Sequence, residues 1–427
     1  MKNAWRDCGT SVQFRMFIAA MRRNIMQYPT LKAMLPKTLP SRNHTAIHVK
    51  EPSPADNGLE ITCKENVTHY FPYMYLRDHC ACASCYHQTS QQRLNYITNL
   101  DLNIKPSKVH IQEGLLSITW TDRHVSEFDL KRLISRKLTN QSARKYKFAH
   151  EDVVLWDGKQ GIPSLDFMSV LNYKRVLLDW LQALRDHGLV LMTGAPLELG
   201  QLERIGKAVG FIRPTLYGVT VPLRLNPHAT NLGYTNLGLR PHSDLIYYEL
   251  KPSVFILHCI EQVKTGGESI FVDGYRVAEA FREANPEAFA LMTSTPVLHR
   301  ATGVQPNGEG FDQSYARPII ELDMAGRIRR INFNDSHRED FPDTTPEQLP
   351  KIYEAYHELA RMLSDPKFFI QHKLSPGEIC AIDNDRMLHG RNGFEVNEFN
   401  SQRWLQQAYF DWDILLSKMK LLKENIR

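Results

Sequence analysis

Residues 240–244 read RPHSD and residues 387–391 read MLHGR, and the chemistry that these two stretches share decides the fold. In a β-strand, side chains at positions i and i+2 point to the same face, so His242 and Asp244 are expected side by side. His389, supplied by a distant strand, would complete three ligands on one face of an octahedral Fe(II) ion and leave positions open for a co-substrate and O₂. A lone His-x-Asp pair is more often a hydrogen-bonded surface or core histidine, so this motif needs support from the rest of the chain.

The segments around these stretches are strand-like and helix-like in turn. Apolar strand-like runs occur at 254–260, 269–272, 377–382 and 403–410, and Ala325-Gly326 between two further runs indicates a hairpin. Helical spacing of apolar residues predicts helices over 173–187, 275–292, 346–364 and the C-terminal tail. Strands that return through hairpins and turns favour an antiparallel barrel or jelly roll decorated by helices.

Arg403 lies 14 residues beyond His389, on the next strand-like run. Its guanidinium can pair in bidentate fashion with the distal carboxylate of a 2-oxo diacid whose keto-acid end chelates the iron. An arginine that merely lies along a surface strand is the alternative. With the two histidines and the aspartate, Arg403 makes the chain resemble the Fe(II)/2-oxoglutarate dioxygenase superfamily, whose fold is a double-stranded β-helix.

A second metal site is predicted from three cysteines within six residues: Cys80, Cys82 and Cys85. Three thiolates so close in sequence can hold three corners of a tetrahedral Zn²⁺. His124, at the end of the strand expected at 115–120, is the predicted fourth ligand. His79 and His87 are rivals, although neighbours so close in sequence would have difficulty closing the tetrahedron. Three free buried cysteines remain the alternative; a zinc with four protein ligands would be structural, since no position is open to substrate.

Composition excludes several classes of protein. The chain has 427 residues, of which 42% are hydrophobic, and no run of about 18 apolar residues, so no transmembrane helix is expected. The formal net charge is +5, but residues 1–50 alone carry +8, so the rest is nearly neutral and no nucleic-acid-binding surface is expected. Seven cysteines, an odd number in a long chain, favour a reducing intracellular compartment.

The chain is expected to have three parts. Residues 1–45 form a basic N-terminal extension, 46–140 a small β-rich zinc-binding domain, and 150–427 the larger domain with the iron motif. Apolar residues at helical spacing between Phe14 and Ile25, interleaved with arginines, are typical of mitochondrial transit peptides. A tail without a targeting role is the alternative. The predicted location is therefore intracellular, in the cytoplasm or the mitochondrion.

A more specific resemblance extends from about residue 60 to the C-terminus. Its carriers are YLRDHCACASCY (75–86), ITWTDRHVSEF (118–128), LHCIEQVKTGGESIFVDG (257–274), RIRRINFND (327–335), MLHGR (387–391) and AYFDWD (408–413). On these motifs the chain is similar to the family of γ-butyrobetaine and trimethyllysine dioxygenases. The resemblance implies a mainly β fold with helices, in which a double-stranded β-helix dioxygenase domain follows the zinc domain. It implies iron on His242, Asp244 and His389, 2-oxoglutarate on Arg403, and zinc on Cys80, Cys82, Cys85 and His124. O₂ would be consumed, with ascorbate supporting activity.

The resemblance also suggests how a substrate would bind. A trimethylammonium group donates no N–H hydrogen bond, so a protein must bind it through aromatic faces. Tyr217, Tyr234 and Tyr409 match the aromatic cage of the family, whereas Val221 stands where the family has a cage tryptophan. Asn231 and Asn334 match asparagines that bind the substrate carboxylate. The trimethyllysine branch has Asp at the position of Asn231, and an amide can donate to a carboxylate that an Asp would repel.

The sequence therefore predicts hydroxylation of γ-butyrobetaine to L-carnitine. Trimethyllysine or a related betaine is the alternative substrate, favoured if Val221 reshapes the pocket. A different class, a zinc-module binding protein with an inactive dioxygenase body, is opposed by the intact iron motif and Arg403. By analogy with the family, a homodimer is expected, with a small-molecule betaine as the binding partner.

Overall fold

The structure is a computed structural model, and it describes residues 48–49, 56–62, 67–135, 153–225, 231–306, 308–396 and 403–426. The chain divides into two compact units, residues 1–143 and 144–427. The extension expected at 1–45 lies outside the described residues, as does most of the connector between the units. Within the described part, no helix combines the length and the apolar character that crossing a membrane requires.

The first unit is built from small antiparallel sheets. Its strands are β1 (His48–Val49), β2 (Gly58–Thr62), β3 (Thr68–Pro72), β4 (Tyr86–His87), β5 (Gln92–Arg93), β6 (Pro106–Gln112), β7 (Leu115–Trp120) and β8 (Val125–Asp129), and its helices are α2 (Tyr73–Asp78) and α3 (Leu130–Ser135). Alternation along β7, the strand expected at 115–120, buries Leu116, Ile118 and Trp120 in one core. The buried Trp120 indole donates to Ser126 Oγ at 2.9 Å, so its polar atom is satisfied.

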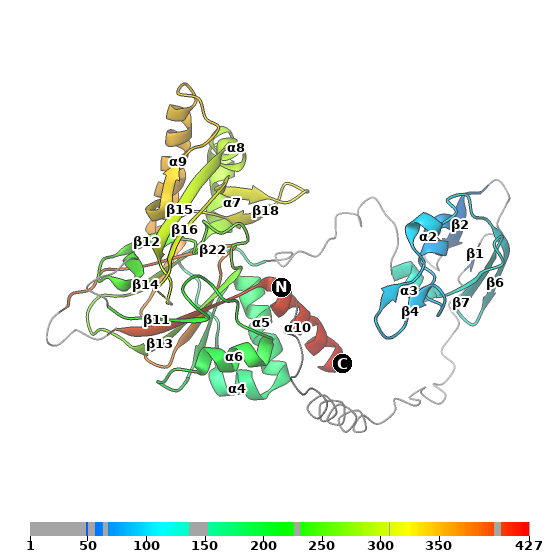
Figure 1. Cartoon of the computed structure of the whole chain (residues 1–427), viewed down its shortest axis with the longest axis horizontal. Coiled ribbons are helices and arrows are strands. Elements are labelled where there is room, and N and C mark those ends of the chain that lie inside the picture. Colours follow the sequence, from blue (N-terminus) through cyan, green and yellow to red (C-terminus); the bar gives the residue numbers. More distant parts are fainter. Residues whose placement is uncertain are drawn as a thin grey trace, which may run out of the picture. The chain divides into compact units, whose positions relative to one another are not determined.

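Two facing sheets form the body of the second unit (Figure 1). The larger has the order β11-β23-β13-β21-β10-β9, with bounds Thr220–Leu223, Trp404–Phe410, Val254–Glu261, Ile379–Asp383, Leu189–Thr193 and Ser164–Asp166. The smaller has the order β12-β22-β14-β20, with bounds Leu239–His242, Met387–Arg391, Ser269–Asp273 and Phe369–His372. Every pairing except β9 with β10 is antiparallel. The jelly roll with helices that the sequence predicts is confirmed.

Strand β13 shows why the larger sheet lies in the interior. Its sequence VFILHCIE is apolar on both faces and is buried from Val254 to Ile260, as expected for a strand covered on two sides. Val254 and Ile256 pack outward against helices α5 (Lys174–His187), α6 (Gln201–Val209) and α10 (Trp412–Ile426), which lie with α4 (Phe167–Asn172) beside this sheet in Figure 1. Phe255 and Leu257 face inward, between the sheets.

The helices follow the predicted patterns, with one correction. Helix α5 ends where Gly188 adopts φ +73°, the left-handed conformation that glycine supplies at helix ends. Helix α9 (Leu349–Leu363) lies within the range expected at 346–364. The helical stretch expected over 275–292 is divided into two helices, α7 (Gly274–Ala284) and α8 (Pro286–Ser294), which are separated at Asn285. The Asn285 side chain caps α8 and Pro286 occupies its first turn, where a proline is tolerated.

Two antiparallel ribbons complete the second unit. The longer pairs β15 (Pro296–Val304) with β16 (Gly310–Pro318), and β19 (Arg338–Asp340) adds to its edge. The shorter pairs β17 (Ile320–Leu322) with β18 (Ile328–Ile331) across the turn expected at Ala325-Gly326, where Gly326 has φ +75°. Helices α7 to α9 pack against these ribbons in a second core. The segment that connects β18 to β19 carries Asn334 toward the interior.

Candidate active site

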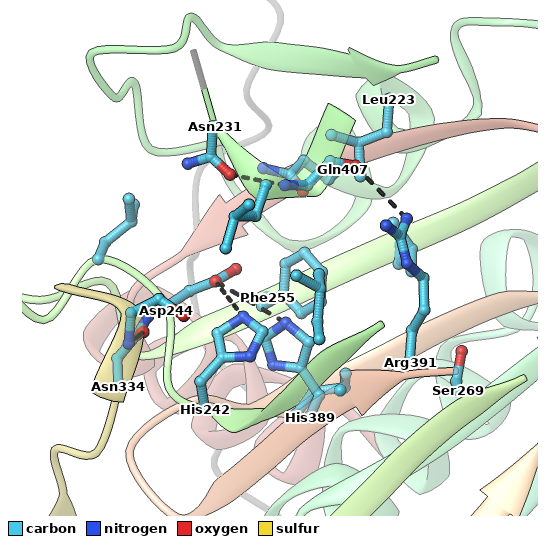
Figure 2. Close-up of a pocket in the computed structure, with 18 of the residues that line it drawn as sticks. Leu223, Asn231, His242, Asp244, Phe255, Ser269, Asn334, His389, Arg391 and Gln407 are labelled. Atoms are coloured by element: carbon cyan, nitrogen blue, oxygen red, sulfur yellow. Dashed lines mark hydrogen bonds and ion pairs between the residues drawn. The ribbon is translucent and has the colours of Figure 1, made fainter. Parts of the chain in front are cut away.

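Two neighbouring strands bring the predicted metal ligands together. His242 ends β12 and His389 lies in the middle of β22, and the two residues are direct partners in the antiparallel register. Their rings consequently lie side by side, with centroids 4.4 Å apart. Asp244 Oδ1 is 3.4 Å from His242 Nε2 and 3.8 Å from His389 Nε2, as Figure 2 shows. One ligand atom from each of the three side chains lies within 4.8 Å of the ligand atoms of the other two.

Asp244 reaches this position by a different route from the one expected. Strand β12 ends at His242, so Asp244 is not the i+2 residue of a strand but lies in the loop that follows. Asn384 holds that loop: its Oδ1 accepts from the Asp244 N–H at 2.8 Å, and its Nδ2 donates to the Asp244 carbonyl at 3.0 Å. Asp244 therefore lies beside His242 as predicted, but the loop held by Asn384 places it there and strand alternation does not.

The protonation of the three side chains suits a divalent metal. The Nδ1 of His242 lies 2.8 Å from the Arg240 carbonyl, which can only accept, so in the neutral ring Nδ1 carries the proton and Nε2 is the atom that can bind a metal. Burial lowers the pKa of His389 to about 4, so this ring is neutral at physiological pH. Burial alone would raise the pKa of Asp244, but the neighbouring imidazoles and a hydrogen bond from Tyr409 hold that pKa well below its usual value. Burial opposes the charged form of His242, but the adjacent Asp244 carboxylate outweighs it and raises the pKa of His242 above its usual value, so a metal at this site would displace a proton from that ring.

The three ligands lie in a cavity of about 300 Å³ between the two sheets. One end of it is strongly cationic, because Arg391 and Arg403 both line the wall. Arg403 is 8% exposed, and it has no acidic or hydrogen-bonding partner among the described residues. Burial lowers its pKa to about 10, which still leaves it charged. A buried guanidinium without a partner is costly unless an anion binds it, so this end of the cavity fits a carboxylate.

Arg391 was not singled out from the sequence, although it belongs to the quoted MLHGR motif. Its guanidinium donates to the carbonyls of Thr235 at 2.5 Å and Leu237 at 2.9 Å, with a longer contact to Gly233 at 3.5 Å. It thereby ties the loop that carries Tyr234 to the strand that carries His389. In Figure 2, Arg391 and Ser269 lie on the opposite side of the histidine pair from Asn334.

All three predicted cage tyrosines line the cavity. The Tyr217 hydroxyl is 2.8 Å from that of Tyr247, a fourth tyrosine on the wall that sequence reasoning missed. Tyr409 is 2% exposed, and its hydroxyl donates to Asp244 Oδ2 at 2.8 Å, so it contacts the metal site directly. His337, also missed, lines the wall with its ring centroid 5.0 Å from that of Tyr247.

The two predicted carboxylate-binding asparagines have their carbonyl oxygens occupied. Asn231 caps the short helix Leu232–Tyr234, where its Oδ1 accepts from the Gly233 N–H at 2.8 Å. Asn334 Oδ1 accepts from the Ser336 N–H at 3.2 Å, and one proton of its Nδ2 goes to the Ser243 carbonyl at 3.3 Å. Both side chains line the cavity. Since backbone N–H groups fix the orientation of both amides, each side chain keeps an N–H donor for a ligand.

The sequence predicts that Val221 leaves the cavity without one aromatic wall. The structure shows another side chain at this place. Val221 is 3% exposed in β11, and it is not one of the described residues that line the cavity. Its direct partner across the sheet is Gln407 of β23, which does line the cavity together with Leu223. A period of two from Arg403 through 405 and 407 to Tyr409 could have placed Gln407 on the inner face from the sequence alone.

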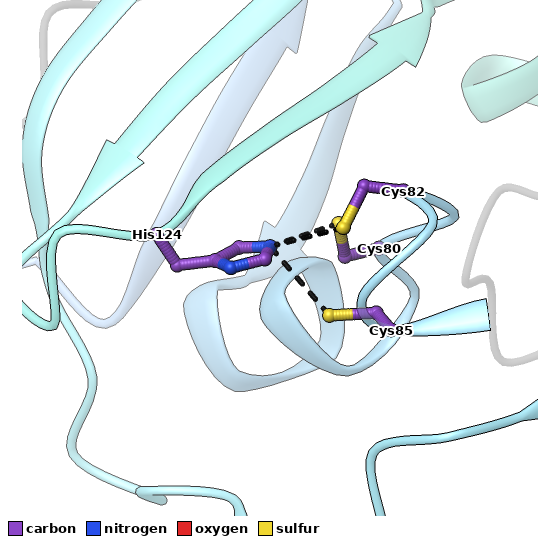
Figure 3. Close-up of side chains that lie close together, drawn as sticks. All are labelled: Cys80, Cys82, Cys85 and His124. Atoms are coloured by element: carbon purple, nitrogen blue, oxygen red, sulfur yellow. Dashed lines mark hydrogen bonds between the residues drawn. The ribbon is translucent and has the colours of Figure 1, made fainter.

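In the first unit, the structure gathers the four predicted zinc ligands (Figure 3). His124 Nε2 lies 3.2 Å from Cys80 Sγ and 3.5 Å from both Cys82 Sγ and Cys85 Sγ. Tetrahedral zinc with ordinary Zn–S and Zn–N bonds places such atoms about 3.5 Å apart. The rival His79 is hydrogen-bonded to the Tyr75 carbonyl and does not belong to the cluster.

The charge near the cluster also suits zinc. Arg77 Nη1 lies 3.4 Å from Cys85 Sγ and its Nε pairs with Asp122 at 3.2 Å. The Asp122 carboxylate accepts from the His124 N–H at 2.9 Å, which fixes the turn that carries the histidine. The other rival, His87, has its Nδ1 within hydrogen-bond distance of the Ser90 hydroxyl. Although burial opposes it, the hydrogen bond with Ser84 helps to lower the pKa of the Cys82 thiol to about 7, so the thiolate that binds metal forms near neutral pH.

Comparison with known families agrees with this geometry. Residues 148–409 match the family model of taurine catabolism dioxygenase, TauD/TfdA family, and residues 51–134 match the model of the gamma-butyrobetaine hydroxylase-like N-terminal domain. Such a barrel, with its metal ligands and unpaired arginine in one cavity, defines a 2-oxoglutarate-dependent dioxygenase that uses Fe(II) and O₂, here joined to a zinc module.

Relatives with curated names narrow the class. Human gamma-butyrobetaine dioxygenase is 34% identical, and the match covers 86% of this chain and 95% of the relative. The gamma-butyrobetaine dioxygenase of Pseudomonas sp. (strain AK-1) is 31% identical, with 86% and 94% covered. The mitochondrial trimethyllysine dioxygenase of Bos taurus is 28% identical, with 86% of each chain covered. The chain belongs to the gamma-butyrobetaine dioxygenase family.

Proposed function

We propose that this protein hydroxylates γ-butyrobetaine to L-carnitine, with conversion of 2-oxoglutarate and O₂ to succinate and CO₂. His242, Asp244 and His389 would hold Fe(II), which supplies the oxidising chemistry when bound with 2-oxoglutarate. The cavity fits that pair of ligands, because it combines two imidazoles and a carboxylate with a buried cationic end. Zinc on Cys80, Cys82, Cys85 and His124 would be structural.

The observation that carries the choice of substrate is the orientation of the two asparagines. Backbone N–H groups bond to the oxygens of Asn231 and Asn334, and this orientation leaves N–H groups of both amides to offer to the cavity. Such donors attract a carboxylate and would repel an α-ammonium group. The faces of Tyr217 and Tyr234 supply the apolar, electron-rich surface that a trimethylammonium group requires.

The protein's contribution to the reaction is positioning. A carboxylate at the asparagines and a cation against the tyrosines would fix both ends of a short chain, so that one methylene faces the metal ligands. Arg403 would hold the distal carboxylate of 2-oxoglutarate at the cationic end, away from Asn334. Apolar walls such as Phe255, whose ring stacks on His389 at 4.8 Å, exclude water from the reacting carbon.

A related betaine is the second candidate, favoured by one observation. Gln407 places an amide on the wall beside Val221, where the family resemblance leads one to expect an aromatic face. An amide there would weaken cation–π binding of a trimethylammonium group by about 0.5–2 kcal/mol. A cation of another shape would lose less.

Product mass after incubation with Fe(II), 2-oxoglutarate and ascorbate distinguishes these candidates. γ-Butyrobetaine, trimethyllysine and other betaines are offered separately, and a mass gain of one oxygen identifies the substrate. H242A is the matched control and should release no substrate-dependent succinate. If γ-butyrobetaine gains no oxygen while another betaine does, the second candidate is correct. If no betaine supports succinate release by the iron-loaded protein, a binding role replaces the enzymatic one.

We further propose an intracellular, mitochondrial or cytoplasmic, location. Support comes from the basic amphipathic character of residues 14–25 and from the mitochondrial label of the trimethyllysine dioxygenase relatives. A shortened N-terminus recovered from purified mitochondria would support import, and an intact Met1 confined to the cytosol would contradict it.

A further inference from the structure

A hydrogen-bonded chain runs along the inner face of β23 to the metal site. Gln407 Nε2 donates to Tyr409 Oη at 3.0 Å, and Tyr409 Oη donates to Asp244 Oδ2 at 2.8 Å. We propose that Gln407 is a positioning residue that keeps Tyr409 donating to Asp244, so that only one oxygen of this carboxylate faces the metal. The inference rests on the iron site and not on the choice of betaine.

The direction of each bond follows from the groups present. An ionised carboxylate has no proton and can only accept, so the single hydroxyl proton of Tyr409 must go to Asp244. Tyr409 Oη then has lone pairs only to offer its other neighbour. Gln407 must therefore present its NH₂ end, since the carbonyl end would set two acceptors against each other. The hydroxyl, with a donor on one side and a carboxylate on the other, has one favourable rotamer.

The hydrogen-bonded series from Gln407 through Tyr409 to Asp244, which we call the relay, gives the two oxygens of Asp244 different roles. Oδ1 is the atom near both histidine Nε2 atoms, whereas Oδ2 is occupied by Tyr409. A carboxylate bound through one oxygen leaves three of six metal positions open, two for the keto acid and one for O₂. If Tyr409 released Oδ2, the carboxylate could turn away from the orientation that presents Oδ1 to the metal, which would weaken metal binding and could place Oδ2 where the reaction needs an open position. The hydrogen bonds of Gln407 and Tyr409 would thus keep one coordination position of the metal open.

Strand register explains how Gln407 enters the cavity. In the register of β23, Gln407 lies opposite Val221 of β11 on one side and Leu257 of β13 on the other. Both neighbours are aliphatic; Leu257 lines the cavity and Val221 does not, and the Gln407 amide between them reaches Tyr409. A large ring at 221 would compete for this space. Val221 and Gln407 are therefore best regarded as one cross-strand pair, in which loss of a bulky residue makes room for the relay.

Binding of Fe(II) to the metal-free full-length protein tests the proposal without turnover. Affinity is measured anaerobically by competition with a coloured chelator, for wild type, Q407L, Y409F and the double variant. Y409F should bind Fe(II) about 10- to 100-fold more weakly, as is usual when a partner of a metal ligand is lost. Q407L should weaken binding by about 3- to 10-fold, the value of one neutral hydrogen bond. The double variant should be no weaker than Y409F, because the relay is already broken. The visible band of the Fe(II)–2-oxoglutarate complex should shift in all three.

Q406L is the matched control, because Gln406 immediately precedes Gln407 on the same strand and does not line the cavity. It should bind Fe(II) as wild type does, and Q407M replaces Q407L if the latter does not fold. Wild-type affinity in Q407L, or losses in Q407L and Y409F that add in full, would overturn the relay while leaving the iron site intact. A wild-type protein that binds no Fe(II) would overturn the site itself, and the relay with it.

Discussion

Replacing Arg403 with methionine should separate folding stability from co-substrate binding. The guanidinium is buried, and no carboxylate compensates it among the described residues. Burial lowers the pKa of Arg403 from 12.5 to about 10, and each pKa unit corresponds to about 1.4 kcal/mol. The charged form therefore costs the folded protein about 3 kcal/mol. R403M removes this cost and keeps most of the apolar stem, so the ligand-free variant should be as stable as wild type or more stable.

Binding of 2-oxoglutarate should change in the opposite direction. A bidentate pair with the distal carboxylate contributes two charge-assisted hydrogen bonds, each worth about 1.5–3 kcal/mol. Losing both should weaken 2-oxoglutarate binding by about 100-fold or more, measured by titration of the Fe(II)-loaded protein under nitrogen. Urea unfolding of the metal-free variant measures the stability.

Arg391 provides the contrast, since it lines the same end of the cavity but donates to backbone carbonyls. R391M leaves these acceptors unpaired, so it should destabilise the ligand-free protein by about 1–3 kcal/mol for each buried one. Our reading of Arg403 fails if R403M loses stability as R391M does while its 2-oxoglutarate affinity stays at the wild-type value.

Three further outcomes are expected. Purified protein should contain one zinc per chain by mass spectrometry. The C82S variant should lose most of this zinc, and its first unit should unfold at a lower temperature. Equal zinc in both proteins would contradict the proposed zinc site. N231D should lower kcat/KM for γ-butyrobetaine at least 10-fold, because two like charges about 4 Å apart repel by about 4 kcal/mol at an effective dielectric constant of 20; an unchanged value would place the carboxylate elsewhere. Burial lowers the pKa of His258 from 6.5 to about 4, so the unfolded chain binds more protons between these values. The unfolding free energy should then fall by up to about 1.4 kcal/mol per pH unit as pH drops from 6.5 to 4, and H258L should flatten this slope in urea titrations.

Residues with metal-binding chemistry were the easiest to predict. Cys80, Cys82 and Cys85 lie so close in sequence that few chain paths can separate them, and the structure gathers them with His124. The position of His389 was harder to predict, because only the pairing of β12 with β22 brings it opposite His242. The type of residue was a sufficient signal in both cases, since few other side chains bind these metals.

Residues that act through hydrogen bonds were harder to find. Asn384 clamps the loop of Asp244, and it lies 140 positions away in the chain with nothing in its own neighbourhood to mark it. Tyr247 and His337 belong to a loop and a short 3₁₀ turn, where no period of two or 3.6 assigns a face. The break inside the helical stretch at 275–292 was not predicted, because the apolar spacing continues through a capping Asn-Pro that ends one helix and begins another.

Strand β23 shows why one register decision controls the whole site. Gln407 and Tyr409 share its inner face, and Arg403, the residue before the strand, lines the same cavity; the three would serve the relay, the metal carboxylate and the co-substrate. The antiparallel pairings with β11 and β13 hold this register from both sides. A slip by one residue would move both inward groups to the outer face and bring Gln406 and Ala408 into the cavity. The apolar outer contacts of Ala408 and Phe410 with the helices therefore select the register that also assembles the chemistry. Packing on the outside of the sheet and catalysis on the inside are thus specified by the same alternation along the strand.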